Sequence, residues 1–274
     1  MIKLWIPVPV TDLSSFSRSW PLSETIAGAG PPVVLVPGAL SSARQTWTPL
    51  VRQLEGLREL VLVELLSVAR SESLAALPVV ETEAQHLLRA VTETGSAVDA
   101  VAISFGCLVL LAAAQRQPSS FRSLAFVEPA EVSEQSTKYA AEVFRSAQRR
   151  LEQQGPDAAV EAIVRFSDPE HVDELRGSRA WRGWRDHLAG LPLYVRALDE
   201  QWDTGVGCDL PSIVVSGGRR PQAQALISRL TNATLVELHG AGHAPQFRRL
   251  QELLRALQTL WSGAGDDSEQ AAEV

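Results

Sequence analysis

Short, almost continuous apolar runs alternate along the chain with segments whose apolar residues follow a helical period. Strands that are apolar on both faces and separated by helices form a parallel sheet with helices on both sides. The first thirty residues are expected to add one or two leading strands. Six runs end in turn residues and predict buried strands: Val33–Val36, Leu60–Glu64, Val98–Ile103, Leu124–Val127, Ser212–Val215 and Thr234–Leu238.

The segments between these runs predict amphipathic helices. One face carries Trp47, Leu50, Val51 and Leu54, and another carries Ala84, Leu87, Leu88 and Val91. The segment 107–114 is apolar all round, which indicates a central, buried helix. A terminal helix is expected to present Phe247, Leu250, Leu254, Leu257 and Trp261. From Gly263 the chain consists of small and acidic residues and is expected to be a flexible acidic tail.

One long stretch, 133–204, contains helical patterns and no strand. Because it is too long for a connection inside a compact domain, it predicts a helical lid. The sequence therefore divides into a core in two parts, 1–132 and 205–262, a lid at 133–204, and the tail at 263–274. Aromatic residues of the lid either form its own core or line an apolar pocket. The pocket candidates are Trp181, Trp184, Tyr194 and Trp202, together with Leu40 of the core.

Composition excludes several classes of protein. The 274 residues are 45% apolar and 21% charged, as in globular proteins, which excludes disordered, collagen-like and coiled-coil chains. The net charge of −7 comes with no basic block, which argues against nucleic acid or an anionic membrane as partner. Two cysteines cannot build a disulfide framework or a four-cysteine zinc site. With no signal-like or membrane-length apolar run, we expect a cytoplasmic monomer or homodimer that binds a small molecule.

The sequence Ala102-Ile103-Ser104-Phe105-Gly106 carries the strongest chemical signal. A strand runs directly into Ser104 and a helix begins directly after it. Small residues two positions before and after the serine let strand and helix pass closely, as in a nucleophile elbow. The new helix also offers the Phe105 N–H to a developing oxyanion. The structural alternative is that Ser104 merely caps the helix.

Two further loops follow strands and have suitable chemistry. His243 lies in Gly240-Ala241-Gly242-His243-Ala244-Pro245, after the last strand, where a histidine can reach the serine as a base. The turn Pro37-Gly38-Ala39-Leu40 follows the first core strand. Its Ala39 N–H, or that of Leu40, is the expected second oxyanion donor, unless the turn is an ordinary one. The other histidines and Cys107 are interpreted as surface or packing residues.

These landmarks together resemble the α/β-hydrolase superfamily. They occur in order as PPVVLVPGALSSARQTW, VDAVAISFGCLVLLAAA, SLAFVEPAE and IVVSGGRRP followed by LVELHGAGHAPQF. The resemblance extends from Pro32 to Trp261. It implies an α/β fold with an eight-stranded, mostly parallel sheet, and places the lid between the sixth and seventh strands. The fold alone does not set the reaction.

The sequence departs from the common family pattern in four places. Pro37 replaces a usual histidine, Ala102 replaces the first elbow glycine, and the loop Ser67–Ser71 lacks its usual glycines. The turn 217–221, which follows the seventh strand and normally holds the triad acid, contains no carboxylate.

An acid is still needed to orient the histidine. Glu128, at the end of the sixth strand, is the best substitute. Glu131, Asp203 and Asp209 stay open as alternatives, as does the absence of any acid.

Three functional hypotheses follow. The first is a serine hydrolase that cleaves a hydrophobic ester, lactone or thioester with Ser104, His243 and Glu128. The second is a non-hydrolytic enzyme of natural-product biosynthesis on the same scaffold, such as a cyclase, lyase or dehydratase. The third is a ligand-binding protein that retains only the appearance of a triad. The chain has no metal-ligand spacing, Walker lysine or dinucleotide-binding glycine motif, so no cofactor is implied.

Overall fold

A computed structural model describes residues 23–67, 78–130, 134–200, 208–218 and 220–270. Within them a seven-stranded sheet has the order β1-β3-β2-β4-β5-β6-β7. Strand β1 is antiparallel to β3, and the other neighbours are parallel. The strands are β1 Ser23–Ile26, β2 Val33–Val36, β3 Leu60–Val63, β4 Val98–Ile103, β5 Phe121–Val127, β6 Ser212–Ser216 and β7 Ala233–Glu237.

All six apolar runs form strands within a few residues of the expected bounds, and β1 is a leading strand. The described residues thus give seven strands instead of the eight that the family resemblance implied. A second leading strand would fall within 1–22, outside the described residues.

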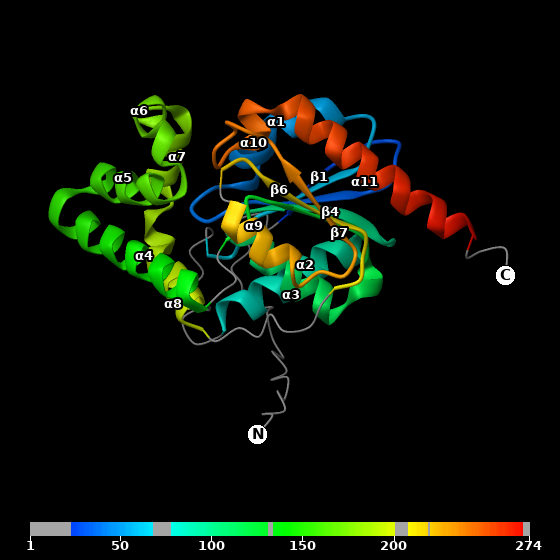
Figure 1. The fold of residues 1–274 in the computed structure, drawn as a ribbon, viewed down its shortest axis with the longest axis horizontal. Coiled ribbons are helices and arrows are strands. Elements are labelled where there is room, and N and C mark those ends of the chain that lie inside the picture. The colour runs from blue at the N-terminus through cyan, green and yellow to red at the C-terminus, as the bar shows by residue number, and fades with distance from the viewer. Residues whose placement is uncertain (1–22, 68–77, 131–133, 201–207, 219, 271–274) are drawn as a thin grey trace, which may run out of the picture.

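Helices cover both faces of the sheet, as Figure 1 shows. Helices α1 (Ala43–Leu54) and α11 (Leu250–Gln270) pack on one face, with the short α10 (Pro245–Arg248) beside them. Helices α2 (Val79–Glu93), α3 (Phe105–Arg116) and α9 (Arg220–Ile227) cover the other face. Alternate residues of β2 enter the two cores, which explains why its whole apolar run is buried. Helix α3 is buried from its start through Ala114, as its apolar sequence predicted.

The segment between β5 and β6 contains helices joined by short turns and no strand in its described residues, and it lies beside the core in Figure 1. Gly155, with φ 89°, separates its first two helices, and Pro156 starts the second. We keep the name lid for this segment. Its helices are α4 Glu134–Gln154, α5 Pro156–Ser167, α6 Val172–Leu175, α7 Arg179–Asp186 and α8 Leu191–Asp199.

The segment 263–274, expected to be a flexible acidic tail, is helical in its described part, because α11 continues to Gln270. Two glycines, Gly263 and Gly265, lie in this extension, and each costs a helix only about 1 kcal/mol relative to alanine. No proline interrupts it, so the helix that the apolar repeat starts can propagate. Residues 271–274 lie outside the described residues.

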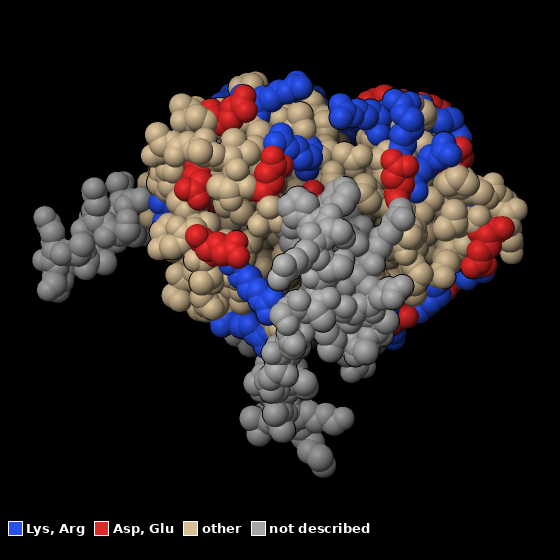
Figure 2. All heavy atoms as spheres, turned by 180° about the vertical axis from the view of Figure 1, so that it is seen from behind, with Lys and Arg blue, Asp and Glu red and all other residues tan. Residues whose placement is uncertain are grey.

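The surface carries both signs of charge. On the face shown in Figure 2, basic and acidic side chains are interspersed. Many are paired, as in the contacts of Arg145 with Asp199 and of Arg165 with Glu161. Exposed pairs of this kind contribute little to stability. Within the described residues, none of the helices combines the length and apolar character needed to span a bilayer.

Candidate active site

Ser104 occupies a strained elbow between β4 and α3. Its backbone has φ 55° and ψ −123°, in a region that non-glycine residues seldom adopt. Gly106 permits the close passage of strand and helix, because a Cβ there would lie 2.3 Å from the Pro37 carbonyl oxygen. The Ser104 hydroxyl makes no capping hydrogen bond to α3. Ser104 is thus the N-cap residue of α3 by position, as the structural alternative had it, but its side chain does not cap the helix.

The elbow is held by backbone contacts with the end of β5. The Ser104 N–H donates to the Val127 carbonyl at 3.0 Å, and the Ser104 carbonyl accepts the Ala130 N–H at 3.2 Å. Residues 104 and 128 are thereby fixed at the carboxyl ends of two neighbouring strands.

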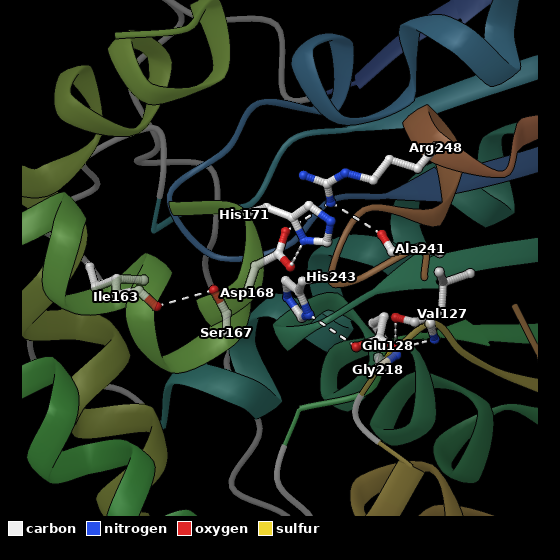
Figure 3. A network of polar contacts seen from close by, with 12 residues as sticks. Val127, Glu128, Ile163, Ser167, Asp168, His171, Gly218, Ala241, His243 and Arg248 are labelled. Carbon is white, nitrogen blue, oxygen red and sulfur yellow. Dashed lines mark hydrogen bonds and ion pairs between the residues drawn. The ribbon is translucent and has the colours of Figure 1, made fainter. Parts of the chain in front are cut away.

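Glu128 follows Val127 at the end of β5 and reaches His243. The distance from Glu128 Oε2 to His243 Nδ1 is 3.3 Å, marginally longer than the expected contact of about 2.6–3.2 Å. Glu128 is fully buried, and the His243 side chain is 18% exposed. Figure 3 shows the histidine ring turned toward this carboxylate.

The other Glu128 oxygen binds the turn after β6. Oε1 accepts the N–H groups of Gly217 and Gly218, the latter at 3.1 Å. The carboxylate thus lies against the turn in which the family pattern expects the acid, although it comes from the neighbouring strand. Asp209, another candidate acid, instead accepts the Thr231 hydroxyl at 2.6 Å. Glu131 and Asp203 lie outside the described residues.

The contacts of Glu128 favour its ionised form. Burial raises the pKa of this carboxyl, but the hydrogen bond and charge of His243 act in the opposite direction. The Gly217 and Gly218 amides also lower it, and the net result is a pKa below the usual value. An ionised carboxylate therefore faces His243 Nδ1 at neutral pH.

The turn after β2 packs against the elbow. A Cβ on Gly38 would lie 3.2 Å from Ser104 Cβ, so the glycine allows this close approach. Leu40 has φ 58°, and its N–H donates to Tyr194 Oη at 3.2 Å. Of the two expected donors in this turn, the Leu40 N–H is therefore already engaged, and the Ala39 N–H is the remaining candidate, together with the Phe105 N–H at the start of α3.

Backbone strain converges on this site. In the described residues, positive φ occurs at three non-glycine positions, namely Leu40, Ser104 and Glu128. They follow three neighbouring parallel strands, β2, β4 and β5. Such conformations cost about 1–3 kcal/mol each and cluster at functional sites.

Two cavities meet at Ser104 and His243. The inner one, about 100 Å³, is mainly apolar and lies under the lid. The outer one, about 860 Å³, is a wider groove between the lid, α1 and α10, and it has more polar side chains in its lining than the inner one. We call them the chamber and the groove. The chamber is lined by Ala39, Leu40, Ser104, Phe105, Ala130, Ala140, Phe144, Val160, Ile163, Val164, Phe166, Ser167, Trp184, Tyr194, Leu198 and His243.

Only some of the residues that the sequence predicted for the pocket line a cavity. Leu40, Trp184 and Tyr194 line the chamber as expected. Trp181 is outside both cavity linings, which corrects its assignment. It is 1% exposed, and its indole N–H donates to Asp157 at 2.7 Å, so it packs inside the lid. Trp202 lies outside the described residues.

Sequence reasoning missed a polar cluster that joins the lid to the histidine loop (Figure 3). Asp168 accepts His171 Nδ1 at 2.7 Å and Arg248 Nη1 at 2.8 Å. Arg248 also donates to the Ala241 carbonyl at 3.1 Å. A Cβ on Gly242 would lie 2.3 Å from Asp168 Oδ1, so the glycine beside His243 permits this docking. No motif signals the cluster, since its members join only when the lid packs.

Ser104 and His243 face the same cavities, but no hydrogen bond joins them among the described residues. Catalytic contacts are often long without substrate and tighten when it binds. No three His, Cys, Asp or Glu side chains gather into a possible metal site in the described part of the chain. Cys107 is buried, and its thiol faces the Ala102 and Val127 carbonyls, as a packing residue would.

Comparison with known proteins identifies the fold family. The sequence profile of the alpha/beta hydrolase family matches residues 33–256. No curated protein matches the sequence.

Solved structures give the same result for the fold. The enol-lactonase from Burkholderia xenovorans LB400 has a TM-score of 0.70 and 19% identity, over 88% of this chain and 95% of that one. MenH from S. aureus has a TM-score of 0.72 and 13% identity, over 89% and 98%. A thermophilic esterase from Thermogutta terrifontis has a TM-score of 0.67 and 17% identity, over 88% and 93%. At these identities the likeness establishes a shared fold.

Proposed function

Because the chain belongs to the alpha/beta hydrolase family, we propose that it is a serine hydrolase that cleaves an ester, lactone or thioester. Ser104 is the nucleophile, His243 the general base and Glu128 the acid that orients it. The Ala39 and Phe105 N–H groups bind the oxyanion. No cofactor takes part in this scheme.

The observation that carries the proposal is the contact between Glu128 and His243 beside the strained serine. A carboxylate at Nδ1 keeps the proton on that nitrogen and leaves Nε2 free to accept one. The pKa of Glu128, held below its usual value by His243 and the glycine amides despite burial, keeps this carboxyl ionised. A purely structural glutamate would need only the amides of Gly217 and Gly218.

The reaction follows from these positions. Ser104 Oγ attacks the substrate carbonyl carbon as its proton passes to His243 Nε2, and the negative oxygen is stabilised by the two amides. The bond to the leaving group breaks, and His243 returns the proton to the departing oxygen or sulfur. Water then attacks the acyl-enzyme with the same base, which releases the acid and restores Ser104.

The two cavities suggest an asymmetric substrate. The chamber is small and mainly apolar, so it suits a short, apolar acyl group. The groove is larger and includes arginine and carboxylate side chains, so it suits a bulkier, more polar leaving part. The lid sequence led us to expect a hydrophobic substrate. The two cavities narrow that expectation, because only the acyl side of the scissile bond would need to be apolar.

The first experiment tests the nucleophile with a fluorophosphonate probe. We expect one adduct on wild-type protein, carried by Ser104, and none on Ser104→Ala. The matched control is Ser167→Ala, because Ser167 also lines both cavities but donates to the Ile163 carbonyl at 3.1 Å. Labelling that persists in Ser104→Ala, or no labelling of the wild type, would contradict the proposal. The second result favours a non-hydrolytic role.

The second experiment tests the acyl side with a series of p-nitrophenyl esters. Turnover should be highest for short acyl chains and fall as the chain outgrows the chamber. Phe144→Ala enlarges the chamber and should move the optimum to longer chains. An optimum for long chains in the wild type would contradict the placement of the acyl group.

A further inference from the structure

Tyr194 brings a hydroxyl group from the lid into the wall of the active site. It lies on α8, is 1% exposed and lines the chamber. Its Oη accepts the Leu40 N–H at 3.2 Å and lies 3.0 Å from Ser67 Oγ. The lid backbone comes close at the same place, since a Cβ on Gly190 would lie 2.8 Å from the Ser67 carbonyl oxygen.

The Leu40 contact falls in the turn that carries an oxyanion donor. Leu40 is 2% exposed and has a positive φ, so its N–H needs a protein acceptor to hold this conformation. Tyr194 supplies that acceptor. The next part of the turn is already fixed, because Ser42 caps α1 and Glu64 accepts the Ala43 N–H at 2.9 Å. The tyrosine hydroxyl therefore completes the support of the turn on its Ala39 side.

The same side chain also contacts the residue with the other donor. The rings of Tyr194 and Phe105 are 5.1 Å apart at 83°, an edge-to-face pair. Tyr194 thus contacts Leu40, the neighbour of one proposed donor, through its hydroxyl, and Phe105, which carries the other, through its ring.

We propose that Tyr194 is a positioning residue of the oxyanion hole, through which the docked lid fixes the turn that carries the Ala39 N–H. The inference rests on the proposed serine hydrolase function and adds a role for the lid beyond covering the substrate. In this arrangement the lid is a part of the catalytic machinery, because the core alone leaves the Leu40 N–H without this acceptor.

The partner of Tyr194 in the core is itself rigidly held. Glu83 is fully buried and accepts the Ser67 N–H at 2.9 Å and the Leu66 N–H at 2.8 Å. Ser67 in turn meets the tyrosine hydroxyl. A chain of hydrogen bonds therefore leads from α2 to the loop that follows β3, from that loop to Tyr194 of the lid, and from Tyr194 to the turn after β2. The hydroxyl stays neutral, because burial raises the pKa of Tyr194 far above its usual value.

The test uses Tyr194→Phe, which keeps the ring and removes the hydroxyl. We expect kcat on a short-chain ester to fall about 10- to 100-fold, less than loss of a whole oxyanion donor costs. KM should stay within about threefold, because the lost support acts mainly on the transition state. The affinity for a trifluoromethyl ketone, whose adduct places an oxyanion in the hole, should fall by a factor similar to that for kcat.

The chain offers a matched control, because its second tyrosine, Tyr139, is also in the lid but is 65% exposed. Tyr139→Phe should leave kcat and inhibitor affinity unchanged. Unchanged kcat and ketone affinity in Tyr194→Phe would overturn the inference, even with a lower melting temperature. If that variant does not fold, Ser67→Ala decides, with a smaller loss of the same kind expected and wild-type values contradicting it.

The result separates this inference from the function on which it rests. Failure of the fluorophosphonate to label Ser104 in the wild type would contradict the serine hydrolase itself. Normal labelling and turnover, with Tyr194→Phe equal to wild type, would contradict only the role of the lid hydroxyl.

Discussion

Two of the fully buried carboxylates of the described residues lie on neighbouring strands, one at the amino end and one at the carboxyl end of the parallel sheet. Asp99 lies near the start of β4, and Glu128 lies just after the end of β5. Asp99 contacts the guanidinium groups of Arg58 and Arg122 and accepts the Ser123 hydroxyl at 2.7 Å. Glu128 faces two glycine amides and His243.

The difference in partners separates a structural carboxylate from a candidate catalytic one. Two guanidinium groups balance the charge of Asp99, so this carboxylate is held in a structural ion-pair cluster. The partner of Glu128 is instead an imidazole, the side chain that most often serves as a general base, and His243 also faces the cavities beside Ser104. Burial of a carboxylate alone therefore does not indicate function, whereas contact with a histidine that lines the cavities beside Ser104 makes Glu128 a catalytic candidate.

The largest effect is expected from Glu128→Gln. The amide retains one oxygen for the glycine N–H groups, but its NH₂ faces Nδ1 and favours the wrong histidine tautomer. We expect kcat/KM to fall by roughly 10²–10⁴-fold, with a small change in stability. Steady-state kinetics and thermal unfolding of the same samples measure both. A loss of stability with a normal rate would make Glu128 only a cap for the turn after β6.

Asp99→Asn should give the opposite pattern. It leaves two partly buried guanidinium groups without a countercharge, with Arg58 at 14% and Arg122 at 25% exposure. We expect the free energy of unfolding to fall by about 2–4 kcal/mol, less than for a fully buried pair. Activity per folded molecule should be unchanged, since Asp99 lies at the amino end of β4 and Ser104 follows the carboxyl end of the same strand. A lower kcat in a fully folded Asp99→Asn variant would contradict this expectation, because it would show that the amino end of the sheet affects the site at the carboxyl end.

A third buried carboxyl, Glu83, extends the comparison to the way in which stability depends on pH. Burial raises its pKa to about 7, although the Ser67 and Leu66 amides oppose the shift. A raised pKa means that the folded state holds a proton that the unfolded state has lost, so its stabilising contribution decreases as pH rises from about 4.5 to 7. The full shift corresponds to roughly 3 kcal/mol. For Glu128, whose pKa is lowered, the contribution is instead lost on acidification below its usual value.

Urea unfolding between pH 4.5 and 7 measures this difference. Glu83→Gln should flatten the decline of stability with rising pH, because it removes the titrating group. Glu128→Gln should leave that decline in place and alter the acidic side only. A slope unaffected by Glu83→Gln would show that this carboxyl is already ionised in the folded protein.

The placement of the main candidate residues could be predicted from the sequence, because position along a parallel strand fixes position in space. Ser104, Glu128 and His243 each follow a strand, and the carboxyl ends of those strands meet at one edge. The seven-stranded sheet differs from the expected eight among the described residues, and the strand bounds were correct within a few residues.

The contributions of the lid could not be predicted in the same way. Trp181 and Trp184 are both apolar and three residues apart, yet one packs inside the lid and the other lines the chamber. Sequence spacing does not distinguish these two environments. The contacts of Tyr194 with Leu40, and of Asp168 with Arg248, depend on how the lid docks on the core. Such contacts join residues far apart in the chain and leave no local motif.

Asp168, the fourth buried carboxylate, is 5% exposed and tests whether a histidine partner is sufficient for catalysis. It binds His171 as Glu128 binds His243, but Arg248 occupies its other oxygen and holds it as an anchor between lid and core. Asp168→Asn should therefore reduce stability by about 1–2 kcal/mol and kcat less than tenfold. The control is Asp173→Asn, at an exposed lid position, which should change neither. A loss of kcat as large as that of Glu128→Gln, with the fold intact, would place Asp168 in the catalytic machinery. It would also show that contact with an arginine does not mark a buried carboxylate as structural.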